Sequence, residues 1–250
     1  MMISTSKNKE YKEIIYTIIS VVVLIMLWKI LAIWVGKEII LPSPEATFSK
    51  LIMIIRAENF LQSILSTLIR SMLGFFIAFL LALILGMLAG FFRPIYYLLK
   101  PVIIINKAVP TMAVILLALI WLESEKAPIL VGFLVIFPLL YYNVVEGIRN
   151  VDQKLIEMVK LYKVNKIKMI GELYIPSIKS YLIAGASTAL GLNLKIVIAA
   201  EVLSQPRISI GTNFQIEKAN LNTAGVFAWA IIAIVMAAVL DGVVKLMQKN

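Results

Sequence analysis

The sequence of 250 residues contains no cysteine and no histidine. Without cysteine, the chain can form no disulfide, no thiolate nucleophile and no thiolate zinc site. Without histidine, it lacks the usual general base near neutral pH and the commonest metal ligand. These absences exclude, within this chain, a membrane protease that uses a Ser-His pair and a metalloprotease with His ligands.

Charged residues are also scarce, at 15%, whereas 61% of the residues are hydrophobic. A typical soluble domain is about 25% charged and roughly 45–50% apolar. A soluble fold of this size could not bury so much apolar surface, so lipid is expected to be the solvent for much of it. The formal net charge of +10 then bears on membrane orientation, and we predict no nucleic-acid partner.

Apolar runs of about 20 residues are typical of membrane-spanning helices. The sequence predicts six of them, and therefore an all-α, polytopic membrane protein with a single transmembrane domain over residues 1–250. The predicted spans are 14–35, 67–92, 102–122, 127–147, 180–203 and 225–245. Pro110 and Pro138 fall within the third and fourth spans, where each can bend its helix.

Lysine and arginine are distributed unequally between the two sides that these spans define. With the N-terminus inside, the inner segments carry 14 of these residues and the outer segments carry 6. Because cytoplasmic loops are enriched in basic residues, we expect both termini in the cytoplasm. Residues 1–13 would then form a cytoplasmic N-terminal segment, and residues 148–180 a cytoplasmic loop.

Small residues recur at every fourth position of the second span. They form one stripe along a helix, which allows a neighbouring backbone to approach closely. The members are Gly74, Ala78, Ala82, Gly86 and Gly90. We interpret the stripe as a helix-packing face, with a direct role in lining a pathway as the alternative.

Ionisable side chains inside membrane spans are costly and usually functional. Arg70 and Lys107 lie near span ends, so we expect them to reach the membrane interface. Lys195 and Glu201 are about 240° apart on one helix and cannot be neighbours. Each is therefore expected to meet another helix or water. With Asn193 they are the candidates for a substrate pathway, while a purely structural polar contact remains an alternative.

The 148–180 loop has an amphipathic pattern. Asp152 is expected to cap a short helix, and Asn165 a second one. Four apolar residues of the first helix are predicted to share a face: Leu155, Ile156, Val159 and Tyr162. This helix either lies on the bilayer surface or inserts into a cytoplasmic partner.

This loop resembles the EAA motif of binding-protein-dependent ABC transporter permeases. In that motif, Glu-Ala-Ala is followed six residues after the Glu by Gly and later by Ile-x-Leu-Pro. The matching positions are Glu157-Met158-Val159, Lys163 and Leu173-Tyr174-Ile175-Pro176. Both alanines are replaced, and Lys163 stands where the family has glycine. If the turn requires a positive φ, lysine adopts it at a cost.

Other motifs resemble the permease subfamily for nitrate, sulfonate and taurine, over residues 36–245. They are Leu41-Pro-Ser-Pro44, Ser66-Thr-Leu-Ile-Arg70 leading to Gly74, Lys100-Pro101, Ala108-Val-Pro110 with Ile120-Trp121, and Ala199-Ala-Glu201 ahead of Ile210-Gly211. Each motif is weak alone, but their order and spacing together are specific.

The resemblance implies the permease fold of a type I ABC importer in the cell membrane, in contact with lipid. Its partners would be cytoplasmic ATP-binding subunits, an external solute-binding protein and a second permease chain, expected to be a second copy. The residues that would couple to the ATPase are Leu155, Glu157, Met158, Val159, Lys163, Leu173 and Pro176. The solute would be small, and Lys195 would favour an anionic or sulfonate-like one.

The chain itself is expected to be no enzyme and to need no cofactor, since it lacks a Gly-x-x-x-x-Gly-Lys-Ser/Thr phosphate-binding loop. An ion-gradient-driven secondary transporter is one alternative, although such folds often have inverted repeats and the two halves here show no convincing correspondence. A passive membrane scaffold is another. An intramembrane enzyme would have to rely on Asp241 and Glu201, which fall on different predicted helices.

Overall fold

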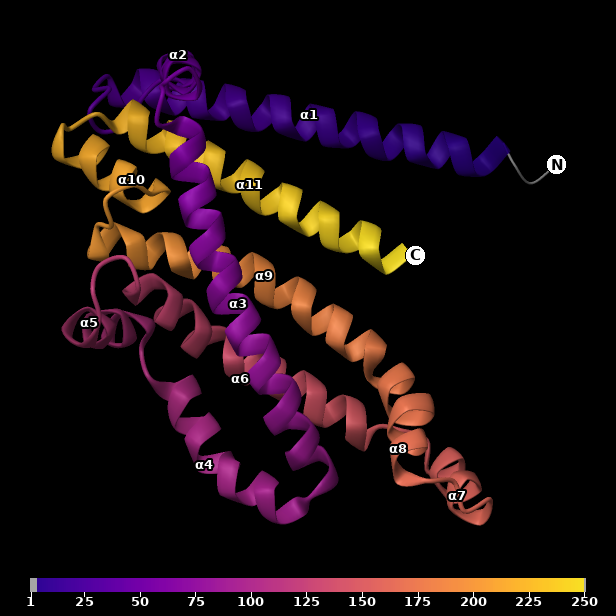
Figure 1. Ribbon diagram of the computed structural model, residues 1–250. Coiled ribbons are helices and arrows are strands. Elements are labelled where there is room, and N and C mark those ends of the chain that lie inside the picture. Colours follow the sequence, from indigo (N-terminus) through magenta and orange to yellow (C-terminus); the bar gives the residue numbers. More distant parts are fainter. Residues whose placement is uncertain (1–3, 250) are drawn as a thin grey trace. The chain divides into compact units, whose positions relative to one another are not determined.

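The computed structural model describes the backbone of residues 4–249 and the side chains of residues 14–159, 161–165 and 168–243. Every regular element in the described backbone is a helix (Figure 1). The elements are α1 Ser4–Val35, α2 Pro44–Ile55, α3 Phe60–Phe91, α4 Arg93–Ala108, α5 Thr111–Trp121, α6 Ala127–Arg149, α7 Gln153–Leu161, α8 Lys166–Met169, the π-helical segment η1 Ile170–Tyr174, α9 Ile175–Ser204, α10 Ile210–Ala219 and α11 Thr223–Lys249.

Five of the described helices are long and apolar enough to cross a membrane, or six if one bent pair counts as a span. That pair replaces the single, bent helix expected over the third predicted span, 102–122. The chain instead forms α4 and α5, which meet at an angle of 99°. Pro110 explains the break, because it has no amide hydrogen to donate and biases Val109 toward the extended conformation in which the structure holds it. Pro138, in contrast, lies inside the uninterrupted α6.

The chain divides into two compact units. The first comprises residues 1–60 and 214–232. In it the Trp28 indole donates a hydrogen bond of 3.0 Å to the carbonyl oxygen of Pro42, and its ring stacks on Phe227. Ser43 caps α2 by accepting a hydrogen bond from the amide of Ala46. An ion pair of 3.5 Å joins Lys50 to Glu217.

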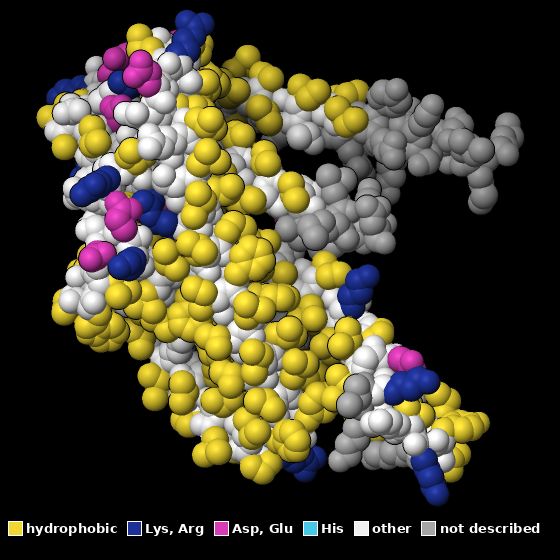
Figure 2. All heavy atoms as spheres, in the orientation of Figure 1, with side chains coloured by type: hydrophobic (Ala, Val, Ile, Leu, Met, Phe, Trp, Pro, Cys, Tyr) yellow, Lys and Arg dark blue, Asp and Glu magenta, His cyan; other side chains and the backbone are white. Residues whose placement is uncertain are grey.

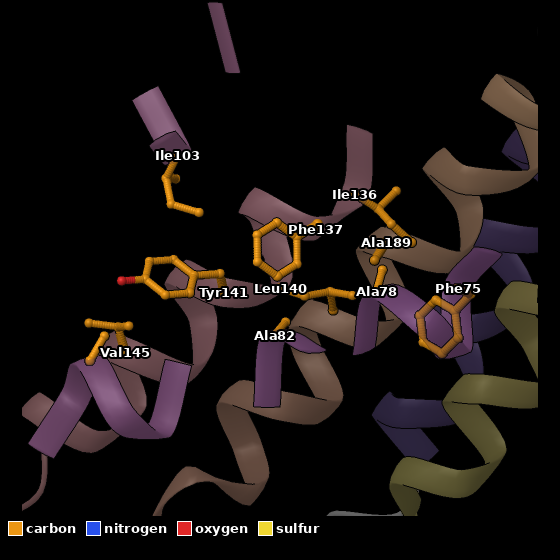
Figure 3. Packing of buried hydrophobic residues seen from close by; sticks show 11 residues of the cluster. Phe75, Ala78, Ala82, Ile103, Ile136, Phe137, Leu140, Tyr141, Val145 and Ala189 are labelled. Carbon is orange, nitrogen blue, oxygen red and sulfur yellow. The ribbon is translucent and has the colours of Figure 1, made fainter. Parts of the chain in front are cut away.

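The second unit, residues 61–213 and 233–250, has its core between α3, α4, α6 and α9. Figure 3 shows the bulky side chains of α6 in this core beside the small ones of α3. The buried members are Phe75, Ala78, Ala82, Ala89, Ile103, Ile136, Phe137, Leu140, Tyr141, Val145 and Ala189. Aromatic and aliphatic groups of α6 therefore fill the space that the alanines leave.

The stripe of small residues on α3 faces α6. Ala78 and Ala82 are fully buried. A Cβ atom added at Gly74 would lie 2.9 Å from the carbonyl oxygen of Ile129, and one at Gly86 would lie 2.7 Å from Cβ of Val144. At Gly90 the added atom would meet Ile148 in the same way. Any larger side chain would force α3 and α6 apart.

Helices α6 and α9 pack as an antiparallel pair. The contacts that added Cβ atoms would make show this order: Gly132 near the start of α6 meets Asn193 and Val197 toward the end of α9, whereas Gly147 meets Ile178 near its start. Figure 2 shows that apolar side chains cover most of the visible surface along α3. This distribution suits a surface that contacts lipid.

Candidate functional site

Helix α7 begins where the sequence predicted. The carboxylate of Asp152 accepts a hydrogen bond of 2.9 Å from the amide of Lys154 and so caps the helix. The predicted apolar face, however, is divided. Ile156 packs against a buried cluster and Val159 is half-buried, while Leu155 is exposed. The reason is that Ile156 lies about 100° around the helix from Leu155.

The exposed side of α7 and of the turn after it is strongly apolar. Met158 exposes 49% of its surface, Leu161 79% and Tyr162 75%. Figure 2 shows apolar side chains beside basic ones in the region of α7. Glu157 is exposed too, and forms no ion pair with any described side chain. This end of the protein therefore offers an apolar surface flanked by charge.

Lys163 adopts a left-handed conformation with φ of 48°. The amide of Val164 donates a hydrogen bond of 3.2 Å to the carbonyl oxygen of Val159, and that of Tyr162 donates to Met158. The first of these bonds closes the Schellman turn that commonly ends a helix, in which glycine is favoured at the left-handed position. The turn thus requires the positive φ, and lysine supplies it.

The chain returns to the second unit's core through a widened helical turn. Pro176 has no amide hydrogen, and its ring would clash with a carbonyl four residues earlier in an α-helix. The π-helical segment η1 precedes it, with a hydrogen bond from the amide of Ile175 to the carbonyl oxygen of Ile170. The Ser177 hydroxyl donates to the carbonyl oxygen of Leu173 at 2.6 Å.

A buried cluster joins this return segment to the long helices. The Tyr174 ring meets the Phe91 ring of α3 edge-on, with 4.7 Å between the centroids. The other buried members are Val144, Ile148, Val151 and Ile178. Ile156 of α7 and Leu173 pack against the same cluster. A displacement of α7 would therefore also displace residues that contact α3, α6 and α9.

A second polar site lies between α3 and α9. Glu201 is fully buried, and its Oε1 lies 2.9 Å from Nη1 of Arg70. Its other oxygen accepts hydrogen bonds from the Thr67 hydroxyl at 2.9 Å and from the Gly211 amide at 3.3 Å. Arg70, which was expected to reach the membrane interface, is buried beside this carboxylate.

Arg70 also holds the turn between α5 and α6. Its Nη2 donates to Glu125, whose other oxygen accepts a hydrogen bond of 2.8 Å from the amide of Arg207. Desolvation alone would raise the pKa of Glu125, but the bonds from Arg207 and Arg70 outweigh it and the pKa is lowered. Glu125 was not among the predicted site residues, since nothing in a short polar turn indicates partners as distant in the sequence as Arg70 and Arg207.

The three pathway candidates occupy different surroundings. Asn193 is fully buried and donates to the carbonyl oxygen of Ser71 at 2.6 Å. Glu201 also contacts α3, as described above. Lys195 instead lies on an exposed side of α9. The structure thus joins Asn193 and Glu201 to the same neighbouring helix and leaves Lys195 open.

A hollow of ≈ 430 Å³ was not foreseen from the sequence. It is lined by Lys107 and by one side of α6 from Val135 to Glu146. The ammonium group of Lys107 lies 5.1 Å from the centre of the Tyr142 ring. The available signal was the helical spacing of Tyr142, Asn143 and Glu146 within the fourth predicted span.

Comparison with known families identifies the class of protein. The family described as the binding-protein-dependent transport system inner membrane component matches residues 78–250. The chain belongs to this family. It is thus the multi-pass permease of an importer in the inner membrane, and functions with an ATPase and a solute-binding protein. ATP hydrolysis belongs to the separate ATPase subunit, and the permease is the non-catalytic transport component.

Individual relatives agree with the assignment. The permease is 25% identical over 205 residues to a putative ABC transporter permease protein of Methanocaldococcus jannaschii, covering 80% of this chain and 77% of that protein. It is 24% identical over 237 residues to the taurine transport system permease protein of Escherichia coli, covering 92% and 85%. The solved structure of the MetNI methionine ABC transporter, inward facing, matches with a TM-score of 0.60 and 14% identity, over 75% of this chain and 95% of that one. This last likeness shows the fold.

Proposed function

We propose that the permease pairs with a second copy of itself and receives the motion of the ATPase through α7. The exposed apolar end of α7 carries this proposal, since Met158, Leu161 and Tyr162 have no cover within the described chain. A groove on a cytoplasmic ATP-binding subunit would bury them. Glu157 would meet a cation on the same subunit, and Leu155 and Val159 would complete the contact.

The route of the motion follows from the contacts behind α7. Closure of the ATPase pair would displace α7, and the turn at Lys163 would transmit this displacement to the return segment. Leu173 and Pro176 lie there, and Tyr174 packs on Phe91 of α3. A shift of α7 would thereby move α3, α6 and α9 and reopen the pathway on the other side.

Orientation and domain organisation complete the proposal. The basic residues favour both termini, residues 1–13 and the loop 148–180 in the cytoplasm. Residues 1–250 act as one permease domain, whose exposed apolar side chains contact lipid acyl chains. The solute-binding protein would then deliver its cargo at the opposite side, where the turn containing Glu125 lies.

The transported solute is proposed to be a small anionic or sulfonate-like compound. The name of the Escherichia coli relative assigns that protein to taurine, which carries a sulfonate group. Lys195 offers a positive charge on an exposed side of α9. Of the three pathway candidates, Lys195 lines the pathway in this proposal, while Asn193 and Glu201 hold α9 against α3.

The coupling role can be tested with the tagged permease expressed with its ATPase. We expect Glu157→Lys to reduce the recovery of the ATPase after mild-detergent purification and to abolish uptake, while membrane insertion is unchanged. Glu123→Lys makes the same charge change at an exposed turn outside α7 and should retain the ATPase. Normal recovery and uptake in Glu157→Lys would overturn the coupling assignment.

A further inference from the structure

The hollow beside α6 is lined by polar groups that belong to a membrane-spanning helix. Tyr142, Asn143 and Glu146 lie on the side of α6 that lines it, and Lys107 of α4 closes it. The stretch from Val135 to Glu146 covers about 16 Å of helix within a membrane-spanning segment. Ionisable and amide groups in such segments usually face water or protein. The hollow is therefore suited to water rather than to acyl chains.

The neighbouring helix α9 presents an exposed row of its own. Its members, at helical spacing, are Ala184, Thr188, Leu192, Lys195 and Ala199. Small side chains predominate in this row, and Lys195 is its one charge. Each residue of this row is followed in the sequence by a residue that packs on α6. Gly185, which follows Ala184, lies against the side chain of Asn143.

These two rows lie on the same side of the helix pair. On α6 the row Val135, Leu139, Tyr142 and Glu146 also comes one residue before a row that faces α9, in which Asn143 meets Gly185 and Gly147 meets Ile178. On either helix, a side chain points about 100° away from the side chain of the residue that follows it, always in the same rotational sense along the chain. Because α6 and α9 run antiparallel, the two rotations turn both rows toward a common side. Lys107 and Lys195 thus belong to one surface of the second unit.

We propose that this surface, formed by the hollow and the exposed row of α9, is a wall of the translocation pathway and that Lys107 binds the acidic group of the passing solute. The proposal deepens the function proposed above and rests on it. The Tyr142 ring lies below the ammonium group of Lys107 and holds it over the hollow. Asn143 uses one amide hydrogen for the carbonyl oxygen of Leu139, which leaves its second for a ligand.

The surface carries two lysines, Lys107 and Lys195, and one carboxylate, Glu146, so its net positive charge favours an anion as the occupant. No described carboxylate lies within ion-pair distance of Lys107 or Lys195. Neither lysine is therefore compensated by a direct ion-pair partner. The volume of ≈ 430 Å³ lies within the range of about 300–1,000 Å³ typical of small-molecule sites. A sulfonate or carboxylate with a short organic part would fit.

Thiol labelling tests this assignment, because the chain has no native cysteine. The complete transporter, with its ATPase, would carry Leu139→Cys in native membranes. Leu139 lines the hollow, and Leu80→Cys on α3, where Leu80 exposes 56% of its surface, serves as the lipid-facing control. Two hydrophilic thiosulfonate reagents would be compared, one bearing an ethylsulfonate and one a trimethylammonium group. For each reagent, the rate of labelling of the protein is divided by the rate at which the same reagent reacts with a free thiol in solution.

We expect Leu139→Cys to react and Leu80→Cys to remain unmodified. At Leu139→Cys the anionic reagent should react about fivefold faster than the cationic one, because of the nearby positive charge. Lys107→Gln should remove most of this preference. Lys100→Gln removes the same charge from α4 outside the hollow and should preserve it.

Two results would overturn the proposal. Absence of labelling at Leu139→Cys would mean that lipid or another chain covers the hollow. A charge preference that is absent, or that Lys107→Gln leaves unchanged, would mean that Lys107 binds no anion. Failure of the coupling proposal is seen separately, as retention of the ATPase by Glu157→Lys, so the two hypotheses can fail independently.

Discussion

Arg70 of α3 and Glu201 of α9 form an ion pair of 2.9 Å although 131 residues separate them in the chain. Both side chains are buried, and Arg70 is the one cation that pairs with Glu201 among the described residues, whereas Arg70 also pairs with Glu125. Thr67 and Gly211 complete the shell of the carboxylate. The pair thereby fixes α3, α9 and the start of α10 to one another within the second unit.

Removing Arg70 alone should be more harmful than removing both members of this pair. Arg70→Met leaves a buried, uncompensated carboxylate, and we expect a loss of about 3–5 kcal/mol in the free energy of unfolding. The double variant Arg70→Met with Glu201→Met should lose less than Arg70→Met alone, whereas Glu201→Met alone leaves Arg70 paired with Glu125. Denaturant titration of the purified transporter in detergent measures all three. Losses that simply add would show that the two charges are not coupled.

The stripe on α3 gives a second prediction. Gly74→Ala would bring Cβ to 2.9 Å from the backbone oxygen of Ile129, and we expect a loss of about 1–3 kcal/mol as the helices separate. Gly191→Ala is the matched control, since an added Cβ there meets nothing within 4 Å. It should be neutral or gain up to about 1 kcal/mol from helix propensity. Thermal unfolding in one detergent compares the two, and equal effects would contradict the packing role.

The sequence predicted those features that depend on local spacing. The stripe from Gly74 to Gly90 could be identified because a repeat of four residues marks one side of a helix. The cap at Asp152 follows from the chemistry of neighbouring residues in the same way, whereas a positive φ at Lys163 was suggested only by the glycine that the family has at this position. Five of the six spans were recovered as uninterrupted helices for the same reason.

Features that depend on distant partners were not predictable. Arg70 was assigned to the interface because its position near a span end says nothing of Glu201. Glu125 and the hollow at Lys107 arise only when the helices pack. The break between α4 and α5 is intermediate: Pro110 indicates a bend, but the angle of 99° depends on the surrounding structure.

The turn at Lys163 provides a prediction in which a variant should be more stable than the natural chain. A non-glycine residue in the left-handed region costs about 1–2 kcal/mol, whereas glycine adopts it freely. Part of that gain is offset because glycine is more flexible in the opened loop. We therefore expect Lys163→Gly to stabilise the turn by about 1 kcal/mol. Lys163→Val should weaken it, because a branched Cβ fits a positive φ poorly.

Hydrogen exchange of the Val164 amide is the direct measurement, since this amide donates to Val159 across the turn. A stabilisation of about 1 kcal/mol slows its exchange by about fivefold. The amide of Gln205, which donates to Glu201 at the far end of α9, should exchange at the same rate in all three proteins. If Lys163→Gly instead speeds exchange at Val164 alone, the flexibility of the opened loop outweighs the relief of the positive φ, and lysine is the better residue for this turn.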